Sequence, residues 1–433
     1  MLYYSLHKNS PPVSFREATI EGQAPDKGLY FPESIPHLKP DFFTHMEGLK
    51  DQEIAFQVMR PYTTGALSDD ALWTIVEETI HFPIPLVSIT PDIATLELFH
   101  GPTLAFKDVG ARFMSRCLGK FLEGSGKKVT VLVATSGDTG GAVADGFYDV
   151  PGVEVVILYP SGKVSPIQEK QLTTHGKNIH ALEVSGSFDD CQRMVKEAFA
   201  DQELRQQLFL TSANSINVAR WLPQQCYYFL AYKQWKEKGK PPVICVPSGN
   251  FGNICAGLLA FCSGMPVAHF IAACNVNDTI PRYLQSNHYE PRATLPTLSN
   301  AMDVAAPSNF VRILELFQQE LPQLKKNLTA VSVTDAQTVE TIKKVADTYG
   351  YLLDPHGAVG YYALEQHLSQ HPGNKGFFLE TAHPVKFPDA VRQATGLEVP
   401  VPVALEPLLQ KEKISTFIDS RYEELRDYLK AKA

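Results

Sequence analysis

The chain has 433 residues, of which 44% are apolar and 20% charged, and its formal net charge is -8. This length excludes a small binding module and predicts about two to three domains with large cores. The mild acidity and the lack of a long Lys/Arg block argue against nucleic acid as the main partner, because phosphate neutralisation needs a basic stripe.

The cysteines and the N-terminal sequence bear on the compartment. The 7 cysteines form no C-x-x-C pair, which favours free thiols in a reducing environment. The N-terminal residues lack a basic flank followed by an apolar core, and no apolar run reaches the roughly 20 residues that span a bilayer. We therefore expect a soluble, cytoplasmic protein without a membrane partner.

Residues 1–95 differ from the rest of the chain. Prolines and turn pairs interrupt them, and they contain no Gly-rich junction between a strand and a helix. We expect a mainly helical N-terminal extension or domain over residues 1–95, followed by a core over residues 96–433.

From residue 129 onward, short apolar runs alternate with helical patterns, which predicts an α/β fold. The apolar runs are continuous rather than alternating, as is typical of parallel strands covered on both faces. The predicted strands are 129–134, 153–159, 178–184, 243–246, 267–273, 330–333 and 376–380, and the predicted helices include 187–200, 218–235, 253–262 and 335–349.

Three junctions between predicted strands and the following segments have the composition of anion sites. They are TSGDTGG (135–141), PSGNFGN (247–253) and ETAHPVKF (380–387). Unpaired N–H groups at a helix start, flanked by small residues, can hold a phosphate or a carboxylate. The same composition also occurs in turns that bind nothing, so both interpretations stay open from composition alone. None has the dinucleotide or Walker A spacing.

The segment HGPTLAFKDVGARF (100–113) predicts a helix that Thr103 caps. Lys107 then lies in or near its first turn, beside Phe106 and Phe113. Both the helix dipole and the aromatic neighbours lower the pKa of Lys107, as a lysine that forms a Schiff base requires. The alternative from burial statistics is a solvated surface lysine.

The motifs HGPTLAFKD, ATSGDTGGA, PSGNFGN and TAHPVKF, in this order and spacing, resemble the signature of the threonine synthase family. The similarity is to its long, N-terminally extended bacterial and fungal branch, and it extends through GLYFPESIP, SANSINVAR and LDPHGAVGYYAL. The resemblance implies a fold type II pyridoxal-phosphate enzyme, similar to the tryptophan synthase β chain. Such a core has two open, twisted, mostly parallel sheets flanked by helices. We expect a smaller lobe at roughly 105–215 and a larger lobe in the remainder.

The resemblance also implies an activity. The family converts O-phospho-L-homoserine and water to L-threonine and phosphate by elimination and hydration, the last step of threonine biosynthesis. Two alternatives stay open: a phospholyase that releases 2-oxobutyrate from the same substrate class, and a non-catalytic threonine synthase-like protein. The expected oligomeric state is a monomer or a homodimer.

The resemblance assigns cofactor contacts to individual residues. Lys107 would hold pyridoxal 5'-phosphate as a Schiff base and move protons. Thr381 would face the pyridine nitrogen. Asp138 would face a donor such as the ring hydroxyl or a nearby amide, because an ionised carboxylate repels a substrate carboxylate. The expected loop for the cofactor phosphate consists of Ser248, Gly249, Asn250, Phe251, Gly252 and Asn253.

A phosphorylated substrate requires a second anion site with charged donors. Arg220 is the main candidate for the substrate phosphate. For all other candidates except Asn214, a structural cap or a solvated side chain is an equal alternative. The further candidates for the substrate phosphate are Ser212, Asn214, Asn217 and Lys163. The resemblance assigns the loop with Thr135, Ser136, Gly137 and Thr139 to the substrate α-carboxylate or to the border of the cofactor's 3'-oxygen.

His367 and His371 have the i, i+4 spacing of a metal-binding pair. They lack the glutamate of H-E-x-x-H and precede Pro372 near a predicted helix end. We therefore expect solvated histidines and no metal site.

Overall fold

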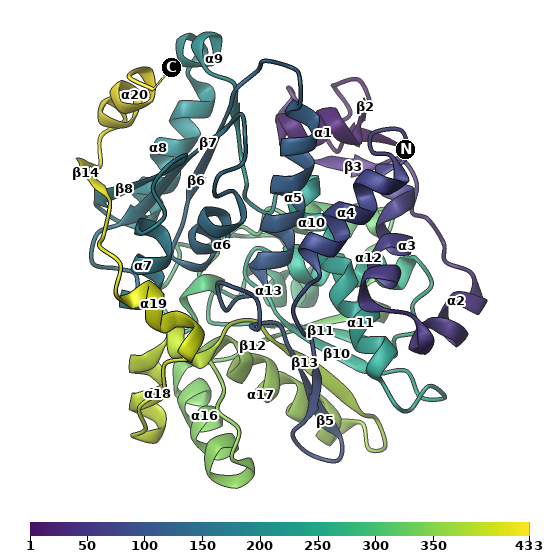
Figure 1. Ribbon diagram of the computed structural model, residues 1–433. Coiled ribbons are helices and arrows are strands. Elements are labelled where there is room, and N and C mark those ends of the chain that lie inside the picture. The colour runs from purple at the N-terminus through teal and green to yellow at the C-terminus, as the bar shows by residue number, and fades with distance from the viewer. Residues whose placement is uncertain (433) are drawn as a thin grey trace.

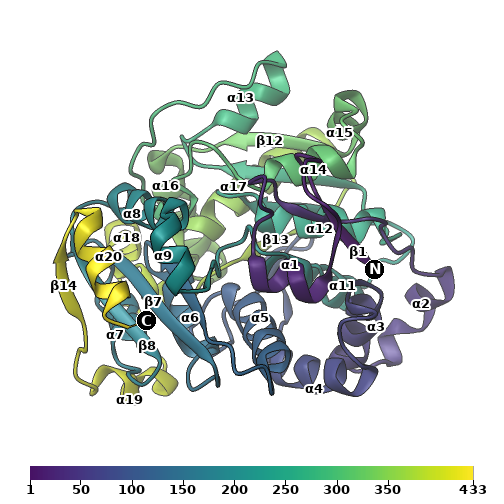
Figure 2. The same ribbon diagram turned by 90° about the horizontal axis from the view of Figure 1, so that it is seen from above.

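Two β-sheets flanked by helices form the body of the protein, and a small antiparallel sheet lies near its N-terminus. The computed structural model describes residues 1–432. The larger sheet has the order β12-β11-β10-β13-β5-β4, the second β14-β8-β7-β6-β9, and the small one β2-β1-β3. Figures 1 and 2 show helices packed around both larger sheets, with α5 between them. The two mostly parallel sheets confirm the expected fold class.

The six-stranded sheet is parallel except at β4, which pairs antiparallel with β5. Its strands are β4 (Leu86–Ser88), β5 (Ile93–Glu97), β10 (Val243–Pro247), β11 (His269–Cys274), β12 (Leu328–Ser332) and β13 (Gly376–Glu380). The helices of the same chain segments are α11 (Gln225–Gln234), α12 (Gly252–Cys262), α13 (Thr279–Ser286), α14 (Phe310–Leu316), α15 (Leu321–Asn327), α16 (Asp335–Tyr349), α17 (Pro355–Gln370) and α18 (Pro388–Thr395).

The five-stranded sheet is parallel throughout. Its strands are β6 (Val129–Ala134), β7 (Val153–Pro160), β8 (Ile179–Ser185), β9 (Leu210–Thr211) and β14 (Thr416–Asp419). The accompanying helices are α5 (Lys107–Leu122), α6 (Asp138–Gly146), α7 (Pro166–Thr173), α8 (Phe188–Ala200), α9 (Gln202–Gln207), α10 (Val218–Trp221), α19 (Glu406–Leu409) and α20 (Tyr422–Lys430).

Local sequence explains where many elements begin and end. All six residues of β6 are buried, as a central strand covered on both faces requires. A capping box of Thr334 and Gln337 starts α16, and Gly350 in the left-handed conformation ends it. The predicted helix 218–235 is divided into α10, a 3-10 turn and α11, because Pro223 lacks a backbone N–H.

The N-terminal segment is mostly helical but also contains a sheet that the sequence pattern did not predict. Its helices are α1 (Phe15–Glu21), α2 (Pro40–His45), α3 (Asp51–Thr63) and α4 (Asp69–Thr79), and its strands are β1 (Leu2–Ser5), β2 (Val13–Ser14) and β3 (Tyr30–Pro32). These strands have only 4, 2 and 3 residues, too few to show a period. The limits of the extension and of the two lobes stay predictions.

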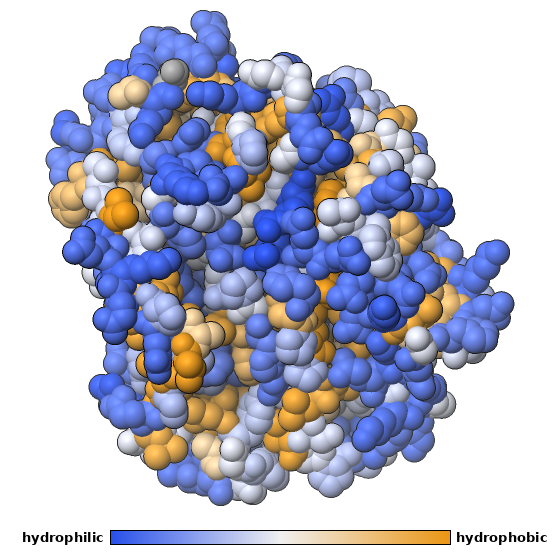
Figure 3. All heavy atoms as spheres, in the orientation of Figure 1, coloured by the Kyte–Doolittle hydropathy of each residue, from blue (hydrophilic) through white to orange (hydrophobic). Residues whose placement is uncertain are grey.

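The C-terminal segment runs from the six-stranded sheet to the five-stranded one, where β14 pairs with β8 (Figure 1). On the way, Leu405 packs against Leu104, Ile167 and Val385. Figure 3 shows apolar side chains at the surface near β14 and α19. The exposed apolar residues of the segment are Leu397, Val401, Val403, Ile414 and Phe417. No helix within residues 1–432 combines the length and apolarity needed to cross a membrane.

Candidate active site

Three neighbouring strands deliver candidate residues to one edge of the six-stranded sheet. Strands β10, β13 and β5 are adjacent and parallel, so their carboxyl ends lie side by side. The loop 248–251 follows β10, Thr381 follows β13, and the segment leading to Lys107 follows β5. Ligands usually bind at this edge of an open parallel sheet.

Backbone hydrogen bonds fix Lys107 beside Thr381. The N–H of Phe106 donates to the carbonyl of Thr381 at 2.9 Å, and the N–H of Leu98 donates to the carbonyl of Glu380 at 3.0 Å. The hydroxyl of Tyr227 also donates to the carbonyl of Phe106. The segment before Lys107 is therefore held on both sides.

Lys107 is the first residue of α5 and is half-buried. Its ammonium nitrogen lies 5.7 Å from the centroid of the Phe106 ring. Burial lowers the pKa of Lys107 to about 8; Asp138 opposes this shift, and the cations Lys386 and Arg220 add to it. More of the side chain is therefore a free amine near neutral pH, the form that attacks a carbonyl carbon.

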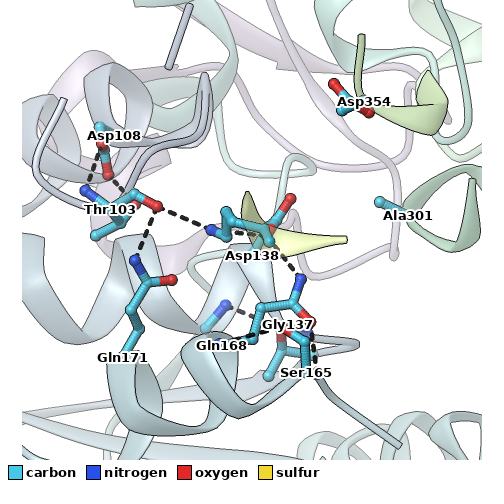
Figure 4. Close-up of polar contacts among 12 residues, drawn as sticks. Thr103, Asp108, Gly137, Asp138, Ser165, Gln168, Gln171, Ala301 and Asp354 are labelled. Atoms are coloured by element: carbon cyan, nitrogen blue, oxygen red, sulfur yellow. Dashed lines mark hydrogen bonds and ion pairs between the residues drawn. The ribbon is translucent and has the colours of Figure 1, made fainter. Parts of the chain in front are cut away.

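The predicted cap at Thr103 is wrong. Phe106 precedes the first residue of α5, and no side chain caps this helix. The hydroxyl of Thr103 donates to one carboxylate oxygen of Asp108, and the N–H of Thr103 donates to the other at 3.0 Å (Figure 4). The buried carboxylate competes for the hydroxyl, and burial raises the pKa of Asp108 to about 6.

The loop after β10 has the geometry of an anion cradle. Among residues 1–432, the N–H groups of Gly249, Asn250 and Phe251 donate to no protein acceptor. Phe251 has a φ of 60°, and α12 starts directly after it. A Cβ on Gly249 would lie 2.6 Å from Cα of Met302, so only glycine fits there. The loop therefore presents free donors at the positive end of a helix.

Side chains of this loop brace it rather than point to a ligand. Ser248 donates to the carbonyl of Val246 at 2.7 Å, and Asn253 donates to the carbonyl of Pro247 at 2.7 Å. The amide of Asn250 donates to Ser215 at 2.8 Å. The last bond joins the loop to the segment that carries Arg220.

The loop after β6 places Asp138 in the site. The hydroxyl of Thr135 accepts from the N–H groups of Gly137 and Gly140, each at 2.9 Å. Gly137 has a φ of 134°, and a Cβ there would lie 2.5 Å from Gln168. Ser136 and Thr139 are half-buried beside it. This tight turn leads directly into α6 at Asp138.

Lys386 is a candidate site residue that the sequence reasoning missed. It is fully buried, and its ammonium lies 2.8 Å from Oδ1 of Asp138. It also donates to the carbonyl of Thr103 at 2.8 Å, which accepts from Gln171 as well at 3.0 Å (Figure 4). Gln168 donates to the same Asp138 oxygen at 2.9 Å. The only sequence signal was a lysine within TAHPVKF, directly after a predicted strand end.

The ion pair explains the charge of Asp138. Burial alone would raise its pKa, but Lys386 and then Lys107 outweigh this and hold the pKa of Asp138 well below its usual range. Asp138 is therefore an anion at neutral pH. It contacts a side-chain amide and an ammonium in this structure.

Arg220 lies against α5, one turn after Lys107. A Cβ on Gly110 would lie 3.2 Å from Nε of Arg220. Arg220 is 3% exposed, and its guanidinium donates through Nη1 to the carbonyl of Ala213, while its Nε has no partner among the described residues. Burial lowers the pKa of Arg220 to about 10. A buried cation with an unused donor suits an anionic ligand.

The other substrate candidates have different surroundings. Asn217 caps α10 by accepting from Ala219 and donates to the carbonyls of Thr19 and Ser212, so its amide is engaged inside the protein. Ser212 accepts from the N–H of Asn214 at 3.2 Å. Asn214 is half-buried, and Lys163 is exposed.

The predicted histidine pair belongs to a stack of three rings. His367 lies 4.2 Å from His371 and 5.4 Å from His269, measured between ring centroids, with nearly parallel planes. Within residues 1–432, no group of three or more His, Cys, Asp or Glu side chains has an arrangement for a metal ion.

These donors fit pyridoxal phosphate. Lys107 supplies an amine with a lowered pKa, the loop after β10 supplies free N–H groups at a helix start, and Thr381 supplies a buried hydroxyl between them. The group needs an amine, a phosphate cradle and a partner for its ring nitrogen, and the arrangement of β10, β13 and β5 brings these three together.

Comparisons with known proteins agree with this fit. A family model described as pyridoxal-phosphate dependent enzyme matches residues 92–381. Models described as threonine synthase N terminus and threonine synthase, C-terminal match residues 2–80 and 357–429.

Full-length relatives and solved structures give the same result. Threonine synthase of Serratia marcescens is 45% identical over 99% of both chains, and that of Escherichia coli K12 is 45% identical over 94% of both. The crystal structure of threonine synthase from Escherichia coli matches with a TM-score of 0.93 and 43% identity over 100% of both chains. A PLP-bound threonine synthase from Brucella melitensis matches with a TM-score of 0.92 and 35% identity, covering 100% of this chain and 99% of that one.

Proposed function

The chain belongs to the threonine synthase family of pyridoxal-phosphate-dependent enzymes, and from this membership we propose that it converts O-phospho-L-homoserine and water to L-threonine and phosphate. The observation that carries this proposal is the convergence of Lys107, Thr381 and the loop 248–251 at the carboxyl ends of three adjacent strands. The reaction completes threonine biosynthesis.

In this proposal Lys107 both holds the cofactor and moves protons. Bound pyridoxal phosphate supplies an electron sink for the carbanion formed at the substrate Cα. Lys107 takes the Cα proton, and its pKa of about 8 suits an amine that must accept and return protons near neutral pH. A Cβ proton would be removed next and phosphate would leave from Cγ. One of the two removed protons would return to Cγ to form the methyl group and the other to Cα, while the hydroxyl of water would add at Cβ and its proton would pass to the released phosphate.

The remaining residues bind and orient. The free N–H groups of residues 249–251 hold the cofactor phosphate, and the hydroxyl of Thr381 lies beside the ring nitrogen as a neutral partner. Arg220, together with Asn214, takes the substrate phosphate, because Nε of this buried guanidinium has no partner among residues 1–432. The loop 135–139 takes the substrate carboxylate.

The test combines a visible spectrum with product identification. We expect the purified protein to absorb in the visible range, and addition of O-phospho-L-homoserine to change the spectrum and yield threonine and phosphate. If 2-oxobutyrate is the main product, the protein is a phospholyase instead. A colourless protein that takes up no pyridoxal phosphate would contradict both enzymatic proposals.

The Lys107 assignment has its own test. Lys107→Ala should abolish the visible absorbance and the turnover, and borohydride reduction of the wild type should attach the cofactor mass to the peptide containing Lys107. Lys343→Ala, which removes an exposed lysine paired with Asp347 on α16, is the matched control and should behave as the wild type. A Lys107→Ala variant that forms threonine at the parent rate refutes the assignment.

We further propose that the protein works in the cytoplasm, as a monomer or a homodimer. The seven cysteines are free thiols, and only Cys262 is not fully buried, which suits a reducing compartment. Light scattering coupled to size-exclusion chromatography measures the oligomeric state.

A further inference from the structure

Asp138 presents an electrostatic problem for the proposed substrate. It is the first residue of α6, at the end of the loop that we propose for the substrate carboxylate. Its side chain is 5% exposed. A buried, uncompensated anion at this place would repel a carboxylate. A neutral side chain such as asparagine would avoid the repulsion.

Lys386 lies where a compensating charge is needed. Its ammonium is 2.8 Å from Oδ1 of Asp138 and has no exposed surface. Two of its three protons are directed to Asp138 and to the carbonyl of Thr103. Oδ2 of Asp138 has no hydrogen-bond partner among residues 1–432 and stays available as an acceptor.

The pair also connects the parts of the site. Lys386 ends a short 3-10 turn (Pro384–Lys386) that follows Thr381, Asp138 starts the helix after β6, and Thr103 precedes Lys107. One ammonium thus joins the six-stranded sheet, the five-stranded sheet and the segment carrying the proposed catalytic lysine. The charges of Asp138, Lys386 and Arg220 act on the pKa of Lys107.

We propose that Lys386 is a positioning residue that neutralises Asp138, so that the loop 135–139 accepts the substrate α-carboxylate while Asp138 keeps a fixed acceptor oxygen toward the cofactor. This inference rests on the proposed function and deepens it. Lys386 and Asp138 form one charge-compensated unit, in which each charge neutralises the other. Removal of only one of them therefore leaves an uncompensated charge in the site.

The unit predicts opposite effects of two single substitutions on the bound cofactor. The readout is the pH midpoint of the visible absorbance of the holoenzyme, which requires no turnover. Lys386→Met removes a cation near Lys107 and should raise the midpoint by about one pH unit. Asp138→Asn removes an anion and should lower it by about one pH unit. The neutral double variant should return to within about 0.5 pH unit of the wild type.

Ligand binding tests the carboxylate part. L-2-Aminobutyrate carries the α-amino and α-carboxylate groups without a phosphate, and its binding is followed by the change in absorbance. Lys386→Met should weaken this binding by about tenfold or more and raise KM for O-phospho-L-homoserine more than it lowers kcat. The double variant should recover most of the affinity.

The double variant also keeps the test valid if a single variant folds poorly, because breaking one side of a buried pair destabilises a protein whereas removing both charges often does not. The matched control is the pair of Lys233 and Asp51, 2.8 Å apart, which joins α11 to α3. Lys233→Met combined with Asp51→Asn should leave the midpoint and both affinities unchanged.

The outcomes are separable. Midpoint shifts of the same sign in the two single variants, or a double variant no better than Lys386→Met, overturn the proposal. So does weaker binding of O-phospho-L-homoserine with unchanged L-2-aminobutyrate binding, because Lys386 is then a phosphate ligand. If the wild type forms no threonine but the opposite midpoint shifts and the recovery occur, the proposed function fails and the compensated pair stands.

Discussion

Replacing either of two buried arginines by methionine should change the free energy of unfolding, and the two changes should have opposite signs. Arg220 and Arg312 are 3% and 0% exposed, and burial lowers the pKa of each from 12.5 to about 10. This difference corresponds to about 3 kcal/mol of desolvation cost per charged guanidinium. Their hydrogen-bond partners differ, and this difference decides the outcome.

Arg312 uses its donors inside the protein. It donates to the carbonyls of Tyr30, Ser215 and Ile216 and to the side chain of Asn309, and it stacks 4.5 Å from the Trp221 ring. Arg312→Met leaves these acceptors unpaired, at about 1–3 kcal/mol each. The loss over four acceptors exceeds the desolvation relief of about 3 kcal/mol, so we expect a free energy of unfolding lower by at least about 1 kcal/mol.

Arg220 gives the opposite balance. Arg220→Met relieves about 3 kcal/mol and leaves only the carbonyl of Ala213 unpaired, at about 1–3 kcal/mol. We expect the ligand-free variant to lose no stability and to gain up to about 2 kcal/mol in urea unfolding. It should lose about 100-fold in kcat/KM, because a buried charged partner of the substrate phosphate is missing.

Inorganic phosphate added to the holoenzyme links the two measurements, because the cofactor phosphate then already fills the loop 248–251. It should raise the unfolding midpoint of the wild type and of Arg312→Met but not that of Arg220→Met, because only the last variant lacks the proposed ligand of the substrate phosphate. If Arg220→Met is destabilised without ligand and its phosphate response is retained, Arg220 is a structural residue. The reasoning from its unused donor would then be refuted.

Two further predictions concern the loop after β6 and the histidine stack. Gly137→Ala should lower the stability by about 1–3 kcal/mol and abolish the visible absorbance of the bound cofactor. The reason is that Gly137 has a φ of 134° and a Cβ there would lie 2.5 Å from Gln168. Gly239→Ala meets nothing within 4 Å and should be neutral in the same assay. Burial and then the neighbouring His371 and His269 lower the pKa of His367 from 6.5 to about 4. The unfolded chain therefore binds more protons between these values, and stability should fall as pH drops from 6.5 to 4. His367→Gln should remove part of this loss, about 1 kcal/mol after allowance for solvent screening, in urea unfolding at pH 7 and pH 5; an unchanged pH dependence would contradict the depressed pKa.

Local sequence determined most of the elements. The helix 335–349 was predicted with its observed limits, because a capping box and a terminal glycine are encoded within a few neighbouring residues. The continuous apolar runs predicted parallel strands for a similar reason. The motifs HGPTLAFKD, ATSGDTGGA, PSGNFGN and TAHPVKF together indicated the family without any knowledge of the fold. PSGNFGN also pointed to a strand end with free N–H groups.

Only the tertiary structure decided which strand ends meet. Parallel strands of similar apolar composition carry little information about their order in a sheet, so the adjacency of β10, β13 and β5 could not be read from the sequence. The bond between Lys386 and Asp138 joins segments far apart in the chain. The prediction that Thr103 caps α5 failed even though the competing group is only five residues away, because the fold buries the Asp108 carboxylate and that carboxylate accepts from the Thr103 hydroxyl. Helix caps and turns depend on hydrogen bonds between neighbouring residues, so the sequence predicts many of them. The charge balance of a buried site depends on which side chains, distant in the sequence, are buried together in an environment of low dielectric constant.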